Sequence, residues 1–206
     1  MHSIINIIIF VLYPLCVILR FIPDNIVKIT FLMIFEVSMV IIGMHFFFLT
    51  FIMEPFSLLV IAVIYIPLMI IFTNPTTFSF KKILFVFKYW PVKIATEPVN
   101  NKNILLKAIE EELIWRGAFV NLAYWAGVTM PVIIPFGALL FYSVHLKVKR
   151  KIYILKEFEF LFFSTFIVTA YIISNSLLIT ILIHFMRNSF LLCYRESTLK
   201  TELKYR

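Results

Sequence analysis

Long apolar runs separated by short polar breaks dominate this 206-residue chain. The runs lie near residues 4–22, 28–53, 56–72, 104–126, 130–146, 157–173 and 176–194. Each approaches or exceeds the roughly 20 residues that a helix needs to cross the hydrocarbon core of a bilayer. Because lipid offers no partners for backbone N–H and C=O groups, helices that pair these groups internally are expected. The pattern therefore predicts an all-α polytopic transmembrane bundle with about seven spans.

The composition agrees with a membrane protein and argues against a nucleic-acid partner. Hydrophobic residues make up 62% of the chain and charged residues only 15%, whereas soluble domains average about 25% charged residues. The net charge of +8 comes from basic residues in the breaks between spans, not from a basic face on a soluble element. Cys16 and Cys193 fit neither a disulfide framework nor a CxxC metal site, and we interpret both as packing residues.

The charges of the breaks alternate along the chain and predict its orientation. Lysine and arginine gather in the breaks at 73–103 and 147–156, whereas the breaks at 127–129 and 174–175 carry no charge. Basic loops stay on the cytoplasmic side. The N-terminus is therefore expected outside and the C-terminus in the cytoplasm. The abundance of Ile, Lys, Phe and Asn indicates an AT-rich genome, and we expect a multi-pass protein of a bacterial cytoplasmic membrane.

Five charged residues lie inside the span at 104–126, where the bilayer makes them costly: Lys107, Glu110, Glu111, Glu112 and Arg116. Lys107 is expected to extend to the inner membrane interface. Glu112 and Arg116 are four residues apart, so they share a helix face and can form an ion pair. Glu111 is turned about 100° from Glu112, and that arginine does not match it. An unpaired carboxyl in an apolar cavity resists ionisation, which suits a general base that works near neutral pH.

Two other spans carry polar groups at a similar expected depth. His145 lies at the end of the 130–146 span, and His184 and Asn188 share one face of the 176–194 span. With Glu111, three helices thus supply acid–base or ligand groups in the inner half of the membrane. For Glu36 and His45 of the 28–53 span we favour a packing role, because their spacing places them on opposite helix faces.

Three short motifs in these spans resemble those of the CPBP family, which comprises CAAX proteases and bacteriocin-processing enzymes and is also called the Abi family. EELIWRG at residues 111–117 is similar to the family's EExxxR motif, FYSVH at 141–145 to its FxxxH motif, and HFMRN at 184–188 to its HxxxN motif. They occur in the family's order within residues 104–190. The first hundred residues carry no recognised motif.

The resemblance implies an intramembrane endopeptidase that cleaves a hydrophobic or membrane-associated peptide, with a site open toward the cytoplasm. By this similarity Glu111 would activate a water molecule for attack on a peptide carbonyl. Glu112 would hold Arg116 and help to shape the site. The expected partners are therefore a peptide or small membrane-associated protein and the lipid bilayer.

The resemblance also implies roles for the remaining polar groups. His145 and His184 would position water or stabilise charge, and Asn188 would donate to the oxyanion. One glutamate and two histidines could instead hold a zinc ion with an open coordination position. The chain has no HExxH motif, and a metal-free, glutamate-dependent site is the first expectation.

These interpretations divide the chain into three parts and leave two alternative functions. The parts are N-terminal spans with a basic amphipathic loop at 1–103, catalytic helices at 104–194 and a basic cytoplasmic tail at 195–206. One alternative is a bacteriocin immunity or regulatory protein of the same family. The other is a small transporter, but the sequence shows neither an internal repeat nor paired Gly- or Pro-broken helices.

Overall fold

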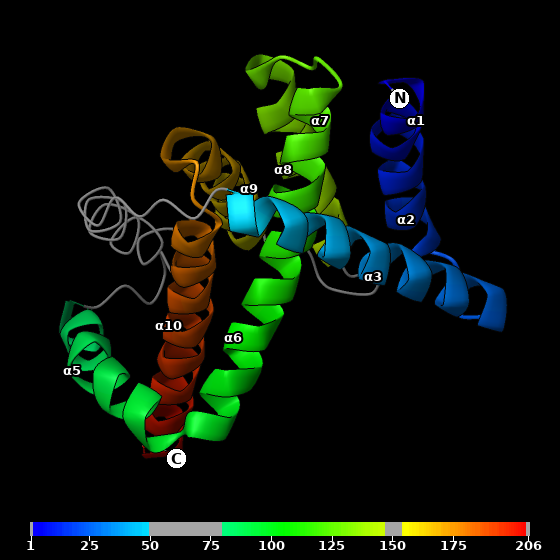
Figure 1. Cartoon of the computed structure of the whole chain (residues 1–206). Helices are drawn as coiled ribbons and strands as arrows, with labels where there is room; N and C mark the ends of the chain where they lie inside the picture. Colours follow the sequence, from blue (N-terminus) through cyan, green and yellow to red (C-terminus); the bar gives the residue numbers. More distant parts are fainter. Residues whose placement is uncertain (1, 50–79, 147–153, 205–206) are drawn as a thin grey trace.

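The computed structural model describes residues 2–49, 80–146 and 154–204. All regular structure in these ranges is helical, which confirms the predicted all-α fold (Figure 1). The α-helices, and the π-helical segments labelled η, are α1 (His2–Ile7), η1 (Ile8–Leu12), α2 (Tyr13–Leu19), α3 (Ile26–Leu49), α5 (Phe80–Thr96), α6 (Pro98–Glu112), η2 (Leu113–Val120), α7 (Asn121–Trp125), α8 (Met130–His145), α9 (Ile154–Ser174) and α10 (Leu177–Lys204).

Helices lie at every predicted span except 56–72, which falls outside the described residues. Among the described helices, three contain stretches long and apolar enough to cross a membrane: Ile26–Phe46, Glu157–Ser174 and Leu177–Tyr194. Many apolar side chains of α3 face outward, including Ile26, which is 81% exposed. Such a surface is unfavourable in water and favourable against lipid tails, so the membrane environment expected from the sequence accounts for it.

Two helices extend beyond the predicted spans. The helical segment made of α6, η2 and α7 begins at Pro98, before the expected start at 104, because proline is well tolerated in the first turn of a helix. Helix α10 continues to Lys204, into the segment expected to be a tail. The turn residues at two breaks are as expected, since Gly127 and Asn175 both have positive φ angles, of 80° and 47°.

The helices pack so that α6 and α10 lie side by side, while α3 crosses the molecule and contacts η2 (Figure 1). Helix α9 packs against α8, and α5 packs along α10. The Trp90 indole N–H of α5 donates a hydrogen bond of 3.0 Å to the Ser189 hydroxyl of α10. Helix α5 lies within the basic break at 73–103, and the cytoplasmic location expected for this break stays a prediction.

Two glycines allow α3 and η2 to make backbone contact. A Cβ atom on Gly117 would lie 2.9 Å from the Gly43 Cα atom, and a Cβ atom on Gly43 would overlap the Leu113 carbonyl oxygen. Small residues permit this kind of close approach between helices in membranes. The crossing fixes η2, and with it Arg116, relative to the end of α6.

Hydrogen bonds from outside the helix backbone support the wider turns of η2. The Tyr13 hydroxyl of α2 donates to the Ile114 carbonyl oxygen at 2.8 Å. The Asn121 side-chain amide donates to the carbonyl oxygen of Gly117 at 2.7 Å. Because π-helical segments inside α-helices are rare and often lie at functional sites, η2 directs attention to the charged residues at its start.

We expect Gly117→Ala to lower the free energy of unfolding by about 1–3 kcal/mol, the usual range for overpacking. The added methyl group meets the backbone of α3 at Gly43, which can move only if the two helices separate. Thermal unfolding in detergent measures the effect. Gly137→Ala is the comparison, because its methyl group would press on the ring of Phe119 instead of on backbone, and its loss should be smaller. A Gly117→Ala protein as stable as the wild type would contradict the crossing.

Candidate active site

The structure brings Glu111 together with both predicted histidines. Glu111 lies at the end of α6, His145 at the end of α8 and His184 in α10. The Glu111 Oε2 atom is 3.5 Å from His145 Nε2 and 3.5 Å from His184 Nε2. The Glu111 side chain is 12% exposed, that of His184 is 2% exposed and that of His145 is 33% exposed. Glu111 and His184 are therefore largely buried, and His145 is the most exposed of the three.

The other ring nitrogens determine what the two imidazoles present to Glu111. His145 Nδ1 is 2.8 Å from the Phe141 carbonyl oxygen, and His184 Nδ1 is 2.7 Å from Glu112 Oε1. A carbonyl or carboxylate oxygen can only accept, so each Nδ1 carries the hydrogen. In a neutral imidazole the Nε2 atom then has a lone pair. Three acceptor atoms, two Nε2 and Glu111 Oε2, thus converge on one place.

Glu112 and Arg116 form the predicted ion pair, and both are fully buried. Arg116 Nη1 lies 3.2 Å from Glu112 Oε1. Neither Glu112 Oε2 nor any side-chain nitrogen of Arg116 has a hydrogen-bond partner among the described residues. The Arg116 guanidinium also lies 4.1 Å from the centroid of the Phe141 ring. The charge of Arg116 is therefore balanced by Glu112 and by an aromatic face, while Glu112 accepts a hydrogen bond from His184.

The expectation that Glu111 is unpaired is wrong. Besides the two histidines, Lys107 lies one turn earlier on α6, with its Nζ atom 3.7 Å from Glu111 Oε1. Lys107 also donates to Glu110 at 2.9 Å, so it does not merely extend toward the membrane interface. Lys107 lies four residues before Glu111, so its contact is one that helical spacing can predict. The contacts with the histidines are not predictable in this way, because His145 and His184 lie on other helices.

Asn188 lies one turn beyond His184 on α10 and is half-buried. Its Oδ1 atom accepts a hydrogen bond of 3.2 Å from Arg187 Nη1. Arg187 is itself paired with Glu159 of α9, and both side chains are buried. The ion pair between Glu159 and Arg187 was not predicted from the sequence. Each of two apolar spans contains one of these charged residues, and this could have indicated the pair, since charged residues inside spans are usually paired within a bundle.

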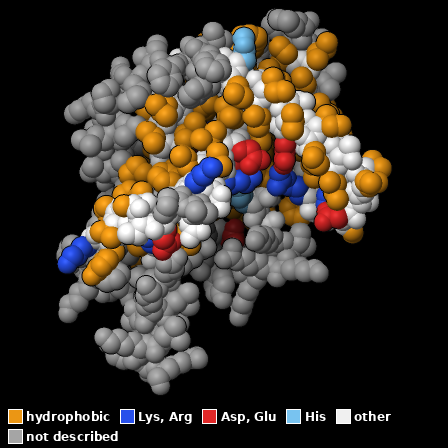
Figure 2. All heavy atoms as spheres, turned by 60° about the horizontal axis from the view of Figure 1, so that its bottom comes forward, with side chains coloured by type: hydrophobic (Ala, Val, Ile, Leu, Met, Phe, Trp, Pro, Cys, Tyr) orange, Lys and Arg blue, Asp and Glu red, His pale blue; other side chains and the backbone are white. Residues whose placement is uncertain are grey.

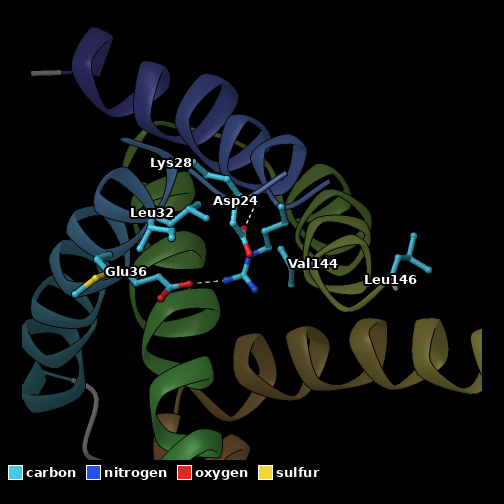
Figure 3. A pocket seen from close by; sticks show the side chains of 9 residues that line it. Asp24, Lys28, Leu32, Glu36, Val144 and Leu146 are labelled. Atoms are coloured by element: carbon cyan, nitrogen blue, oxygen red, sulfur yellow. Dashed lines mark hydrogen bonds and ion pairs between the residues drawn. The ribbon is translucent and has the colours of Figure 1, made fainter. Parts of the chain in front are cut away.

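A cavity of about 480 Å³ lies near the end of α8, and none of Glu111, His145 and His184 is among its lining residues. The neighbours of His145 in the chain, Val144 and Leu146, are among its lining residues. Glu36, for which a packing role was favoured, also lines the cavity and forms an ion pair with Arg20 (Figure 3). The remaining lining residues are Arg20, Asp24, Lys28, Ile29, Leu32 and Met33.

Figure 2 shows acidic and basic side chains close together on one face of the molecule, bordered by hydrophobic side chains.

His45 of α3, for which a packing role was also favoured, is exposed and its ring contacts that of Phe46. Within the described ranges, no three His, Cys, Asp or Glu side chains form a group that could hold a metal ion. This observation does not test whether the reaction needs a metal ion, so the metal-free site stays a prediction.

The fold and these groups define a helical membrane protein that holds a carboxylate and two imidazoles between its helices. Residues 102–190 match the family model described as type II CAAX prenyl endopeptidase Rce1-like. The match confirms the resemblance to the CPBP and CAAX protease family, and it supports a CAAX-type intramembrane endopeptidase at the level of the family. No curated protein and no solved structure gives a significant match to the chain.

Proposed function

We propose that this protein is an intramembrane endopeptidase that hydrolyses a hydrophobic or membrane-associated peptide with water activated by Glu111. The proposal places it in a bacterial cytoplasmic membrane, with its N-terminus outside, as the loop charges predict. The family match supports a protease. The convergence of Glu111 Oε2 with the Nε2 atoms of His145 and His184 carries the mechanistic part of the proposal.

Three converging acceptors suit one water molecule. Water has two hydrogens to donate, one to Glu111 and one to a histidine. We assign the proton to Glu111, which is the role that the family resemblance implies for the first glutamate of the EExxxR motif. The Nδ1 hydrogen bonds to Phe141 and Glu112 keep both Nε2 atoms available as acceptors. Holding the base and the water in place removes much of the entropic barrier to attack.

The reaction then follows from this placement. Glu111 takes one proton from the water as its oxygen bonds to the scissile carbonyl carbon, and the carbonyl oxygen becomes an oxyanion. The Asn188 amide donates a hydrogen bond to this oxyanion. The C–N bond breaks, Glu111 returns the proton to the leaving amine, and one peptide plus one water yields a carboxylic acid and an amine.

The membrane setting of the site supports a hydrophobic or membrane-associated substrate, because the helices described include stretches long and apolar enough to cross a bilayer. Both charged and apolar side chains line the cavity near the end of α8, so its lining does not by itself select an apolar substrate. We propose a short hydrophobic peptide such as a bacteriocin or a pheromone precursor, because a prenylated protein would not be expected in a bacterium.

Cleavage by the purified protein tests the proposed function. The wild type, reconstituted in liposomes, is incubated with a set of short internally quenched peptides rich in Leu, Ile, Val and Phe. Mass spectrometry locates the cut in any peptide that loses quenching. We expect one internal bond to be cut, and the peptide cleaved fastest then serves as the reporter peptide. If every peptide stays intact, the proposed activity is contradicted.

We expect the activity to need no metal ion. Chelators should leave cleavage of the reporter peptide unchanged, and metal analysis of the purified protein should find well below one zinc per chain. Stoichiometric zinc that is lost in His145→Ala would contradict this expectation, and would make His145 and His184 ligands instead of water-positioning groups.

A further inference from the structure

Outside the predicted site residues, one buried charged pair lies against the site. The Arg187 guanidinium of α10 binds the Glu159 carboxylate of α9 through two hydrogen bonds, Nε to Oε1 at 3.1 Å and Nη2 to Oε2 at 2.7 Å. The two side chains are 7% and 6% exposed. A bidentate pair of this kind fixes the plane of the guanidinium, because both groups are flat and rigid.

The third arm of Arg187 reaches Asn188. Arg187 Nη1 donates to Asn188 Oδ1 at 3.2 Å. A guanidinium has only donors, so the oxygen end of the amide must face it, and the Nδ2 end with its two hydrogens must face away. Without this contact the Asn188 amide could rotate by half a turn and present its oxygen where a donor is needed.

The same guanidinium rests on rings that contact both histidines. Its central carbon lies 5.0 Å from the centroid of Phe160 and 4.3 Å from that of Phe163. Phe160 is 4.9 Å from the His145 ring and Phe163 is 5.3 Å from the His184 ring, measured between centroids. Helix α9, which carries none of the predicted site residues, thus supports the site from one side.

We propose that Arg187, held by Glu159, is a positioning residue that sets the orientation of the Asn188 amide. The proposal rests on the proposed function, in which Asn188 donates to the oxyanion. Arg187 acts through Asn188 and does not touch the reacting atoms. The pair adds a specific requirement to the site: a charge at a variable position of the HxxxN motif and a second charge on α9, outside the three motifs, are needed for full turnover.

A double-mutant cycle tests this role. Removing one charge alone would strand the other in an apolar interior, so Glu159→Gln and Arg187→Met are combined into a neutral pair. With the reporter peptide, we expect the neutral pair to lower kcat by about 10- to 100-fold with little change in KM, since misplaced groups cost up to about 10²-fold. In an Asn188→Ala background the neutral pair should lower kcat no further, because the amide that Arg187 orients is already absent.

A structural role gives a different result. If the effects of the neutral pair and of Asn188→Ala multiply, or if the neutral pair turns over like the wild type, the proposal is wrong. Arg187→Lys gives the same cycle if the neutral pair does not accumulate, because lysine keeps the charge but cannot bind Glu159 and Asn188 in the same geometry. Glu97→Gln, which changes the ion pair with Lys93, is the matched control and should keep wild-type kcat.

The same assay separates this proposal from the proposed function. Glu111→Gln tests the water-activating base directly and involves neither Arg187 nor Asn188. If Glu111→Gln abolishes turnover while the cycle is additive, only the positioning role fails. If Glu111→Gln turns over normally, the proposed function fails, and the positioning role that depends on it fails as well.

Discussion

Glu111→Gln is expected to lower kcat for the reporter peptide by about 10²-fold or more, the range for a positioned acid–base group. The amide has nearly the same shape as the carboxylate, so it can occupy the same place beside Lys107 and the two histidines. It cannot take a proton from water. The variant should therefore accumulate and unfold much like the wild type. Single-turnover cleavage in liposomes gives the rate, and thermal unfolding gives the stability.

The control for Glu111→Gln is the same change at its neighbour Glu110. The Glu110 side chain is 38% exposed, and its ion-pair partner Lys107 is 56% exposed. Glu110→Gln should keep wild-type kcat. The comparison also separates the enzyme from an immunity protein that acts by binding alone, because such a protein would still protect cells with Glu111→Gln. A well-folded Glu111→Gln protein with full activity would refute the proposed mechanism.

Glu112→Gln is expected to fail at folding, before any question of catalysis. Glu112 and Arg116 are both fully buried, and the hydrogen bond from His184 also ends on Glu112. Breaking a buried ion pair from one side typically costs about 3–5 kcal/mol, because the remaining charge is left uncompensated. We therefore expect much lower accumulation in membranes and a much lower unfolding temperature than for Glu110→Gln.

A second substitution shows whether the stranded charge is the cause. Adding Arg116→Met to Glu112→Gln removes both charges and replaces the guanidinium with an apolar side chain beside Phe141. Accumulation should recover, since apolar replacements of buried ion pairs are often neutral or stabilising. Activity should stay low, because His184 no longer has a carboxylate to orient it. A Glu112→Gln protein that is as stable as the wild type would contradict the role assigned to the pair.

Much of the fold and the choice of site residues followed from the sequence. Apolar runs of membrane-spanning length predicted helices, because the requirement for backbone pairing in lipid leaves few alternatives. Glu111, His145 and His184 were expected at one depth, since each lies a short distance from a span end on the same predicted side. In the structure the Oε2 atom of Glu111 lies 3.5 Å from the Nε2 atom of each histidine.

The contacts between helices were not predictable in the same way. Helical spacing finds partners on one helix, such as Glu112 and Arg116, but not the hydrogen bond from His184 to Glu112, which joins residues 72 positions apart. The π-helical turns of η2 depend on the close approach of Gly43 and on hydrogen bonds such as that from Tyr13. Neither the close approach nor the hydrogen bond produces a periodic pattern in the sequence. The pairing of Glu159 with Arg187 likewise requires knowledge of which helices are neighbours.

The most direct test of the central claim traces the oxygen atom of the attacking water and measures the requirement for Glu111 in the same experiment. The reporter peptide is incubated in ¹⁸O-labelled water with liposomes that contain either the wild type or Glu111→Gln, and the products are analysed by mass spectrometry. We predict that the wild type cuts one internal bond and that the new C-terminal carboxyl carries ¹⁸O, while Glu111→Gln at equal amounts of folded protein gives almost no product. Labelled product formed at the same rate by both proteins would contradict the assignment of Glu111 as the water-activating base.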